Sequence, residues 1–399
     1  MTITDLHQKT VSLCSKLVQA ESTSGREDKA ALVMRQAMKE WGYDDIQTDE
    51  LGNVIGVIKG SRPGPRVLLD GHIDTVPVTD PSKWTQDPFG GKIVGDRLYG
   101  RGTSDMKGAD AAMVCAAGYY AQQNHRDFPG EIYVAGVVHE ELFEGVASRS
   151  VSKIVRPDYV IIGESTNLNL KIGQRGRAEV VVETIGKSAH SANPEKGINA
   201  VKQMMKLLCE LDKLTPYEQP GLGKAILELT DIISSPYPGS SVMPERCIAT
   251  FDRRLLVGDT PESILLPIKE IIGKIKERDP SFEAKTYLRE EEKPCYTGAV
   301  IKSQRFFPAW RYAENAPFVT AAYQALQRLG TSPELTCYSF CTNGSHYAGE
   351  AGIPTVGFGP SKENLAHTVD EYTLLEQLYK ASEGYCLLID ALLHQDRER

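Results

Sequence analysis

The sequence lacks any apolar run long enough to cross a membrane as a helix, which takes roughly 20 residues. Its N-terminal stretch is amphipathic and is interrupted by Lys9 and Lys16, so the apolar core of a secretory signal is missing too. Of the 399 residues, 41% are hydrophobic and 25% are charged, which is ordinary for a soluble globular protein. A chain of this length exceeds one hydrophobic core, so we expect two domains and no membrane partner.

Neither paired cysteines nor an excess of positive charge is present. The eight cysteines are scattered and form no C-x-x-C pair. Such spacing favours reduced thiols in a cytoplasmic protein over a disulfide framework or a thiolate zinc site. The formal net charge is -8, which argues against nucleic acid as a partner.

Several catalytic signatures are also missing. No Gly-x-Ser-x-Gly occurs, which disfavours a serine hydrolase. His139-Glu140 does not begin a His-Glu-x-x-His motif, because residue 143 is Phe, and a zincin helix is therefore excluded. The absence of a P-loop and of Gly-x-Gly-x-x-Gly weakens a nucleotide-binding interpretation.

Three short aliphatic runs that end in polar clusters predict buried strands of an α/β sheet, over residues 66–70, 131–138 and 159–163. A further strand is expected near 53–59. The expected helices cover about the first twenty residues and then 28–41 and 106–123. The same alternation of helices and strands returns after about Pro317, with a helix to Leu329, a strand over 354–358 and a long helix over 371–393.

Between these two parts the pattern changes to that of a small α+β domain. Strand, helix, strand, strand, helix and strand are expected in turn over 178–185, 197–214, 225–233, 246–256, 261–278 and 282–288. This β-α-β-β-α-β order is of the ferredoxin-like type. We therefore predict a sheet domain formed by 1–176 and 291–399, with an inserted domain at 177–290.

Acidic residues and histidines gather where the predicted strands end. His72 and Asp74 follow the first of the three strands, Glu140 and Glu141 the second, and Glu164 the third. The carboxyl ends of the strands form the binding crevice in an open α/β sheet, so these side chains are expected to meet. Asp105, at a loop-to-helix junction among glycines, can be presented at the same place.

So many carboxylates in one crevice repel one another unless cations are present. Carboxylates and imidazoles together suit zinc or manganese. Two divalent ions bring four positive charges, which three ligand carboxylates and a bridging hydroxide would balance. Any one of these acids alone is more typical of a helix cap or a surface charge, Asp105 included, and His139 alone is more typical of packing.

Three motifs resemble those of the M20 metallopeptidase family, which includes carboxypeptidase G2-like enzymes, acetylornithine deacetylase, succinyl-diaminopimelate desuccinylase and aminoacylases. They are Gly-His-Ile-Asp-Thr-Val-Pro at 71–77, Tyr-Gly-Arg-Gly-Thr-Ser-Asp-Met-Lys-Gly at 99–108, and the pair Glu140-Glu141. The likeness continues through Gly-Lys-Ser-Ala-His-Ser at 186–191 and ends near Ala366-His367-Thr368. It implies a mixed-sheet zinc-hydrolase domain of the α/β class with an inserted ferredoxin-like lid.

The resemblance assigns each residue a role in binding two Zn²⁺ ions, for which Co²⁺ or Mn²⁺ would be substitutes. His72 and Glu164 would hold one ion, Glu141 and His367 the other, and Asp105 would bridge them. The remaining roles fall to Glu140 as general base, to Asp74 as the residue that orients His72, and to His190 as an oxyanion donor across a homodimer interface formed by the lid. On the residues alone, His190 is more typical of a loop hydrogen-bonding group. The family often has a cis peptide bond where Met106 follows the bridging Asp.

The substrate-binding positions depart from the family pattern. Ser241 stands where relatives commonly have Asn, and Asn343 and Gly344 lie in a segment where many have Gly-Thr-Asp-Ala. Arg254 resembles a lid arginine that binds a substrate carboxylate, although a surface arginine on a strand would look the same. His346 is either a specificity residue or an ordinary loop histidine.

The function predicted from these residues is metal-dependent hydrolysis of an amide bond in a small molecule or short peptide. The enzyme would be an N-acyl amino acid deacylase or deacetylase, or a dipeptidase, with Glu140 as the general base of a metal-activated water. The alternative is a non-catalytic ligand- or metal-binding homologue that serves as a dimeric scaffold.

Overall fold

The structure of the chain is a computed structural model, described here for residues 1–395. It divides into two compact units. Unit 1 comprises Met1–Gln174, Glu292–Lys302 and the chain from Trp310 onward, and unit 2 comprises Arg175–Glu291 and Ser303–Ala309. The chain thus leaves the first unit after Gln174, builds most of the second, and returns to the first at Glu292. It then adds Ser303–Ala309 to the second unit before it completes the first.

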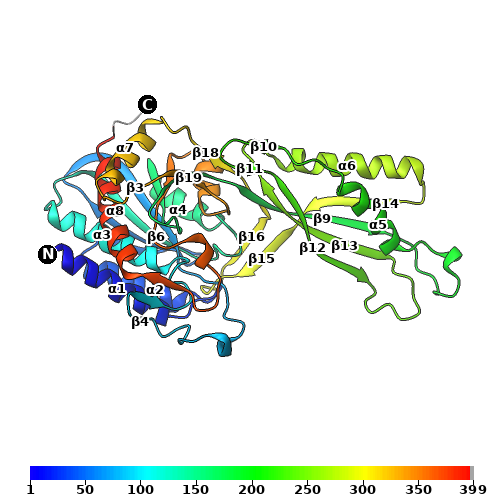
Figure 1. Cartoon of the computed structure of the whole chain (residues 1–399), viewed down its shortest axis with the longest axis horizontal. Coiled ribbons are helices and arrows are strands. Elements are labelled where there is room, and N and C mark those ends of the chain that lie inside the picture. The colour runs from blue at the N-terminus through cyan, green and yellow to red at the C-terminus, as the bar shows by residue number, and fades with distance from the viewer. Residues whose placement is uncertain (396–399) are drawn as a thin grey trace. The chain divides into compact units, whose positions relative to one another are not determined.

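Unit 1 is built on a nine-stranded sheet with the order β1-β2-β6-β3-β7-β20-β8-β18, to which β19 adds by pairing with β8 (Figure 1). Its centre is parallel, because β3 pairs in parallel with both β6 and β7, and β20 with β7. Antiparallel pairs at β1-β2, β2-β6 and β8-β18 make the sheet mixed. The strands are β1 (Asp45–Thr48), β2 (Val54–Lys59), β3 (Arg62–His72), β6 (Pro129–Val137), β7 (Tyr159–Ile162), β8 (Leu170–Gln174), β18 (Trp310–Arg311), β19 (Leu335–Tyr338) and β20 (Thr355–Gly357).

Helices cover this sheet. They are α1 (Ile3–Gln19), α2 (Asp28–Glu40), α3 (Lys107–Gln123), α4 (Ser148–Val155), α7 (Pro317–Gln327) and α8 (Leu375–Leu393). Nearly every residue of α3 is buried, because α1 and α8 contact it in addition to the sheet strand β3. Small Ala and Gly side chains on α3 allow this close approach from several sides. Figure 1 shows α1, α3 and α8 grouped together.

A separate three-stranded sheet in unit 1 has the order β21-β5-β4. It joins β4 (Lys92–Val94) and β5 (Arg97–Tyr99) to β21 (Tyr372–Leu374), which comes from the far end of the sequence. The long helix predicted from residue 371 is therefore wrong in its first turn, since α8 begins only at Leu375. Strand pairing with β5 overrides the helical pattern of residues 372–374.

Unit 2 contains the sheet β12-β13-β9-β14, with the short β17 (Phe306–Phe307) also paired to β9. Along the chain the elements are β9 (Gly176–Ile185), α5 (Ala200–Leu211), the short pair β10 (Glu218–Gln219) and β11 (Gly223–Lys224), β12 (Ile226–Ser235), β13 (Arg246–Leu255), α6 (Pro261–Arg278) and β14 (Glu283–Leu288). The strand pair β15 (Glu290–Pro294) and β16 (Val300–Gln304) follows, and most of it belongs to unit 1.

One face of the unit 2 sheet packs against both of its helices. Val180 and Val182 of β9 and Ala249 of β13 share a buried cluster with Leu207 of α5 and Ile268 of α6. Alternate residues of the strands point to this face, as the period of a half-buried strand requires. The predicted strand-helix-strand-strand-helix-strand order is what the structure contains. The fold class is confirmed: an α/β domain with a mixed sheet and an inserted α+β domain.

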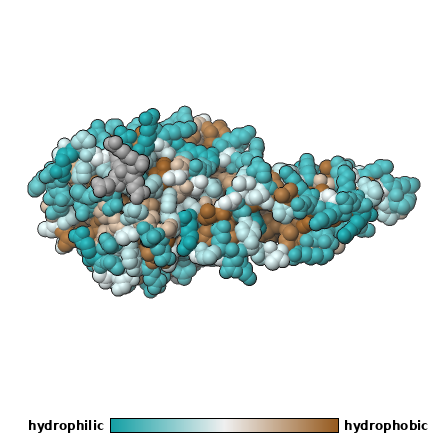
Figure 2. Space-filling model, turned by 90° about the horizontal axis from the view of Figure 1, so that it is seen from above, coloured by the Kyte–Doolittle hydropathy of each residue, from teal (hydrophilic) through white to brown (hydrophobic). Residues whose placement is uncertain are grey.

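The surface is mainly hydrophilic (Figure 2), in line with the 25% of charged residues in the sequence. Figure 2 shows a face covered mainly by hydrophilic side chains, with apolar side chains in separate patches. Among the described residues, no helix combines the length and the hydrophobicity that crossing a membrane requires.

Candidate metal centre

Three neighbouring parallel strands of unit 1 end at the same edge of the sheet. β3 ends at His72, which lies opposite Val137 at the end of β6. On its other side, Asp70 of β3 lies opposite Ile162 at the end of β7. The chain beyond each strand end therefore carries its polar side chains into one region, as the sequence predicts.

His72 is at the centre of the cluster and is only 1% exposed. Its Nε2 lies 2.9 Å from Oδ1 of Asp105, 3.4 Å from Oε1 of Glu164 and 3.9 Å from Oε2 of Glu140. Its Nδ1 lies 2.9 Å from the backbone carbonyl oxygen of Asp74, which can only accept. The Nδ1 atom therefore carries a proton, and Nε2 is the atom presented to the carboxylates.

His367 approaches the cluster from the C-terminal part of the chain. Its Nε2 lies 3.0 Å from Oε2 of Glu141 and 3.1 Å from Oδ2 of Asp105. Since Oδ1 of the same aspartate faces His72, each oxygen of Asp105 faces a different histidine. Unlike His72, the His367 side chain is half exposed. The Asp105–Met106 peptide bond that follows this loop is cis.

Asp74 holds the two glutamates in place. Its Oδ1 accepts a hydrogen bond from the backbone N–H of Glu140 at 3.0 Å, and its Oδ2 accepts one from that of Glu141 at 3.2 Å. Ser24 donates to Oδ2 as well, at 2.6 Å. The carboxylate is 3.5 Å from Nδ1 of His72, farther than the residue's own backbone oxygen. The backbone oxygen of Asp74 makes the nearer contact with the imidazole and its carboxylate makes a longer ion pair with the same ring. The hydrogen bond from Ser24 is not predicted by the sequence.

Burial shifts the pKa of every acid at this edge. Burial raises the pKa of Glu140 well above its usual value, and the neighbouring carboxylates raise it further despite the opposing effect of His72. Burial and the charge of Asp105 raise the pKa of Glu141 to about 7. Burial opposes ionisation of Asp105 too, but hydrogen bonds with His367 and His72 hold its pKa well below the ordinary range. Hydrogen bonds to Asp105 and Glu141 raise the pKa of His367 to about 10.

These shifts indicate that a positive charge among the carboxylates would stabilise their ionised forms. In both histidines Nε2 faces only carboxylate oxygens, so without a cation each imidazole has to be protonated to satisfy them. Two groups of three residues have the spacing of metal ligands. One is His72 with Glu140 and Glu164, and the other is His72 with Asp105 and Glu141. Within each group, one ligand atom from each residue lies within 4.8 Å of the other two. Imidazole and carboxylate donors at this spacing suit divalent first-row metal ions. The donor set fits the metals that the sequence predicts.

Two residues predicted at the substrate have internal partners in unit 1. Asn343 is 3% exposed, donates from Nδ2 to Oδ1 of Asp70 at 2.8 Å, and accepts from the backbone of Gly145 at 2.9 Å. A side chain at Gly344 would meet Nε1 of Trp310, 2.6 Å from the position of its Cβ. The segment is thus hydrogen-bonded to β3 through Asp70, and both polar atoms of the Asn343 amide have partners within unit 1.

Nearby His346 has a partner of its own, since its Nδ1 lies 2.8 Å from a carboxylate oxygen of Glu350. His139 is buried, with its Nε2 3.2 Å from the carbonyl oxygen of Pro294.

The remaining predicted residues lie in unit 2. His190 is exposed, and its Nδ1 accepts a hydrogen bond from the backbone of Ala192 at 3.0 Å. The neighbouring residue Ser191 donates from its backbone to the carbonyl of Ser241 at 2.8 Å, so His190 and Ser241 belong to adjacent segments. Arg254 pairs through Nε with Oδ1 of Asp252 at 2.7 Å.

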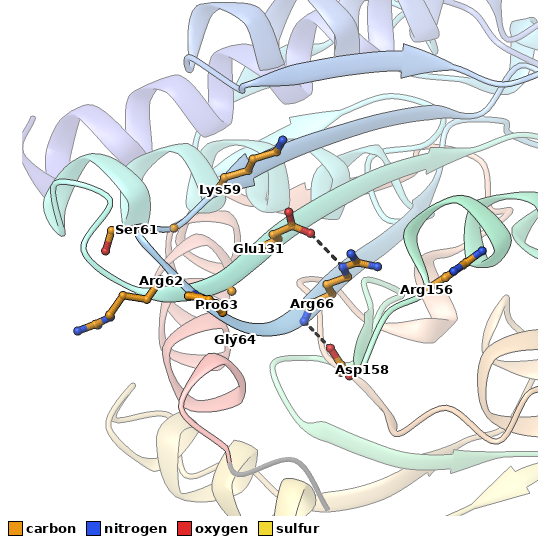
Figure 3. A pocket seen from close by; sticks show the side chains of 11 residues that line it. Lys59, Ser61, Arg62, Pro63, Gly64, Arg66, Glu131, Arg156 and Asp158 are labelled. Carbon is orange, nitrogen blue, oxygen red and sulfur yellow. Dashed lines mark hydrogen bonds and ion pairs between the residues drawn. The ribbon is translucent and has the colours of Figure 1, made fainter. Parts of the chain in front are cut away.

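A cavity of about 590 Å³ lies at the opposite, amino end of the same strands. Figure 3 shows Arg66 bonded to Glu131 and to Asp158, while Arg62 points away from the hollow. No histidine lines it, and both of its carboxylates are engaged with Arg66. The chemistry of a metal centre is therefore found at the carboxyl end of the sheet and not here.

Comparisons with known proteins identify the family of the chain. The sequence model of Peptidase family M20/M25/M40 matches residues 68–391. The chain belongs to this family. The family resemblance that the motifs indicate is thereby confirmed, and the chain is an M20 family hydrolase.

Among M20 relatives, the chain is 32% identical over 383 residues to the "Uncharacterized protein YgeY" of Escherichia coli (strain K12), covering 93% of this chain and 91% of that one. It is 27% identical to the acetylornithine deacetylase of Aliivibrio salmonicida over 92% of each chain. It is 25% identical to the succinyl-diaminopimelate desuccinylase of Hydrogenovibrio crunogenus, covering 94% of this chain and 97% of that one.

Two solved structures share the M20 fold at lower identity. Aminopeptidase PepT from Bacillus cereus ATCC 10987 superposes with a TM-score of 0.75 at 19% identity, over 97% of this chain and 98% of that one. The YXEP protein of Bacillus subtilis, described as a dinuclear metal binding peptidase from the M20 family, gives 0.71 at 16% identity, over 98% of this chain and 100% of that one. At these identities, both comparisons show a shared fold and nothing more specific.

Proposed function

We propose that this M20 family chain is a dinuclear-metal hydrolase that cleaves an amide bond in an N-acyl amino acid or a short peptide. The observation that carries the proposal is the position of Asp105, whose Oδ1 faces His72 at 2.9 Å and whose Oδ2 faces His367 at 3.1 Å. A carboxylate that presents one oxygen to each of two imidazoles is arranged to bridge two ions.

In this proposal His72 and Glu164 hold one ion, Glu141 and His367 hold the other, and Asp105 is shared. We propose Zn²⁺ as the ion, with Co²⁺ or Mn²⁺ able to replace it, because these metals accept mixed nitrogen and oxygen donors. When bound, such ions polarise the carbonyl group of the substrate and lower the pKa of a water molecule.

Glu140 moves the proton. Its Oε1 is buried and makes no hydrogen bond to any described residue, and burial raises its pKa well above the usual range. A carboxylate with a raised pKa is a better base, so Glu140 accepts the proton of the attacking water and transfers it to the leaving nitrogen. Asp74 supports this step because it fixes the backbone N–H groups of Glu140 and Glu141.

The residues of unit 2 are proposed to bind the substrate. Because Nδ1 of His190 accepts a backbone hydrogen bond, the neutral ring carries its proton on Nε2 and can donate it to an oxyanion. Arg254 and Arg177 share the single carboxylate of Asp252. Arg177 also pairs with Glu179 at 3.1 Å, so Arg254, whose side chain is 28% exposed, is the arginine proposed to contact a substrate carboxylate. Ser241, beside the His190 segment, is the polar side chain proposed to contact the substrate there.

We also propose a homodimer through unit 2. β12 is an edge strand whose backbone pairs only with β13 among the described strands. Its side chains Ile232 and Ile233 are 51% and 57% exposed. A long edge strand with exposed apolar side chains is a template for pairing with another chain.

Metal analysis combined with a substrate panel tests this function. The purified chain is assayed with N-acetyl and N-succinyl amino acids and with dipeptides, before and after treatment with a chelator and after return of Zn²⁺, Co²⁺ or Mn²⁺. Two ions per chain and turnover that is lost on chelation and restored by metal are expected. Turnover unaffected by chelation contradicts the proposal, and bound metal without turnover of any amide favours the non-catalytic dimeric scaffold.

A further inference from the structure

Glu371 is a buried carboxylate that the roles proposed above do not use. Its side chain is 0% exposed, and glutamate is almost never fully buried unless it is paired. It stands directly before β21, whose Tyr372 lies opposite Tyr99 of β5 in antiparallel register. Glu371 therefore lies beside the loop that leaves β5 and leads to Asp105.

One oxygen of this carboxylate accepts hydrogen bonds from several backbone N–H groups of the loop. Oε1 of Glu371 accepts hydrogen bonds from the N–H groups of Gly102 at 3.0 Å, Ser104 at 2.8 Å and Asp105 at 3.2 Å. Ser104 is fixed a second time, because its Oγ donates to the backbone oxygen of Tyr372 at 2.8 Å. The backbone of Asp105 is thus held by a residue 266 positions away in the sequence.

The other oxygen is neutralised by an arginine of the same loop. Nη1 of Arg101 donates to Oε2 of Glu371 at 2.5 Å, and Arg101 is itself only 5% exposed. Its guanidinium lies 5.3 Å from the centre of the Trp84 ring. The backbone oxygen of Glu371 accepts from Gly100 at 2.9 Å, so the start of the loop is tied to the same residue.

Glu371 is not placed to be a metal ligand itself. Oε1 already accepts three N–H groups, and Oε2 is paired with the fixed positive charge of Arg101. A guanidinium beside the carboxylate repels a second cation. Glu371 therefore contacts the backbone of the proposed ligand Asp105 and would not contact the ions.

We propose that Glu371, with Arg101 as its counter-charge, is a positioning residue that fixes the loop 100–105 so that the two oxygens of Asp105 face His72 and His367. This inference rests on the function proposed above, because the consequence of that geometry is the shared binding of two ions. Residues that orient a metal ligand are often needed nearly as much as the ligand.

Metal affinity is the decisive measurement. Glu371→Ala and Glu371→Gln are compared with the wild-type chain by competition for Zn²⁺ with a chromophoric chelator and by the visible absorption of the Co²⁺ form. We expect Glu371→Ala to bind metal about 10–100-fold more weakly, with an altered Co²⁺ spectrum. Glu371→Gln keeps one oxygen for the backbone N–H groups but loses the pairing with Arg101, so a smaller loss is expected. Adding Arg101→Met to Glu371→Gln removes the unpaired guanidinium and should restore part of the affinity.

Glu179 provides a matched control. It is also a buried glutamate paired with an arginine, since its Oε1 accepts from Nη2 of Arg305 at 2.8 Å, but it belongs to unit 2. Glu179→Gln and Glu179→Ala are expected to leave metal affinity unchanged. Circular dichroism of the metal-free chains verifies folding, and if Glu371→Ala does not fold, Glu371→Gln decides.

The outcomes separate this inference from the function on which it rests. Wild-type chain that binds no metal ion overturns both. Wild-type chain that binds two ions, together with a folded Glu371 variant that binds them equally tightly, overturns the positioning role alone. The same loss in the Glu179 variants would also overturn it, because the effect would then be one of general stability.

Discussion

Asp74 shows how single side chains determine the geometry of the metal centre. It lies two residues after His72 and so was expected to hydrogen-bond the imidazole, as the resemblance implies. In the structure its backbone oxygen makes the nearer contact, at 2.9 Å, while the carboxylate lies 3.5 Å from the ring and also binds the N–H groups of Glu140 and Glu141. Spacing in the sequence indicates which side chains share a face, but not which atom of a residue comes nearest once the strand has ended.

Glu140→Gln tests the proton-transfer role at the residue scale. The amide keeps the size of the side chain and cannot accept the proton of the attacking water. We expect kcat to fall by a factor of about 10²–10⁴ with little change in bound metal, measured by steady-state kinetics and metal analysis. Glu131→Gln is the control, because Glu131 lies at the opposite end of β6, and it should leave kcat unchanged. Equal kcat in Glu140→Gln and wild type would exclude Glu140 as the base.

Asp110 gives a second prediction at this scale. Its side chain is buried, neither oxygen has a hydrogen-bonding partner among the described residues, and burial raises its pKa well above the usual value. Above about pH 4 an unfolded aspartate loses its proton while the folded one keeps it. Folding stability therefore falls as the pH rises, by up to about 1.4 kcal/mol for each pH unit between the two pKa values.

Asp110→Asn should remove the contribution of Asp110 to the pH dependence of folding stability. The free energy of unfolding of the metal-free chain, measured in urea at pH 4.5 and 5.5, should fall less with pH in the variant than in the wild type. Asp127→Asn is the exposed control, since that side chain is 73% exposed, and it should keep the wild-type slope. Equal slopes for Asp110→Asn and wild type would show that Asp110 is ionised in the folded chain.

At the scale of elements, the metal centre depends on how closely α3 packs against β3. Gly71 precedes His72 on β3, and a Cβ placed there would lie 2.2 Å from Oδ1 of Asp110 and 2.7 Å from the terminal methyl groups of Met106 and Met113. Only a residue without a side chain lets the helix and the strand come this close. The distance between α3 and β3 thus places His72 and Asp105 within reach of each other.

Gly71→Ala should therefore destabilise the chain, while Gly273→Ala should not. A methyl group at Gly71 overpacks the interface and is expected to cost about 1–3 kcal/mol of unfolding free energy. Gly273 lies inside α6, where a Cβ would meet nothing within 4 Å, so alanine there should stabilise by about 0.5–1 kcal/mol. Urea denaturation measures both, and a Gly71→Ala chain as stable as wild type would contradict this description of the interface.

At the scale of the whole molecule, the chain has two units with separate tasks. Every proposed metal ligand belongs to unit 1, whereas His190, Arg254 and the exposed edge strand β12 belong to unit 2. The proposed division is that unit 1 performs the bond cleavage and unit 2 contributes substrate contacts and the contact between two chains.

The dimer prediction belongs to this scale. Lysine at both Ile232 and Ile233 places charge on the edge strand and should prevent pairing, so light scattering should report a monomer where wild type gives a dimer. Metal content should stay the same, because the ligands lie in unit 1. Ile154→Lys is the control, since Ile154 is a 40% exposed isoleucine on α4 and its replacement should leave the dimer intact. A wild-type chain that is monomeric at all concentrations would contradict the proposal.

The sequence alone predicts the three buried strands, the inserted strand-helix-strand-strand-helix-strand domain and the acids beyond the strand ends, because runs of β-branched residues and their periods are local properties of a chain. It does not predict helix α4 or short strands such as β1, β4, β5, β8, β18, β19 and β21, which have no distinctive pattern. The folded chain alone shows that each oxygen of Asp105 faces a different histidine and that Glu371 holds the loop leading to it. His367 and Glu371 come from the far end of the sequence, with Glu371 266 positions from Asp105, and their contacts depend on sheet order and close packing, which no local pattern encodes.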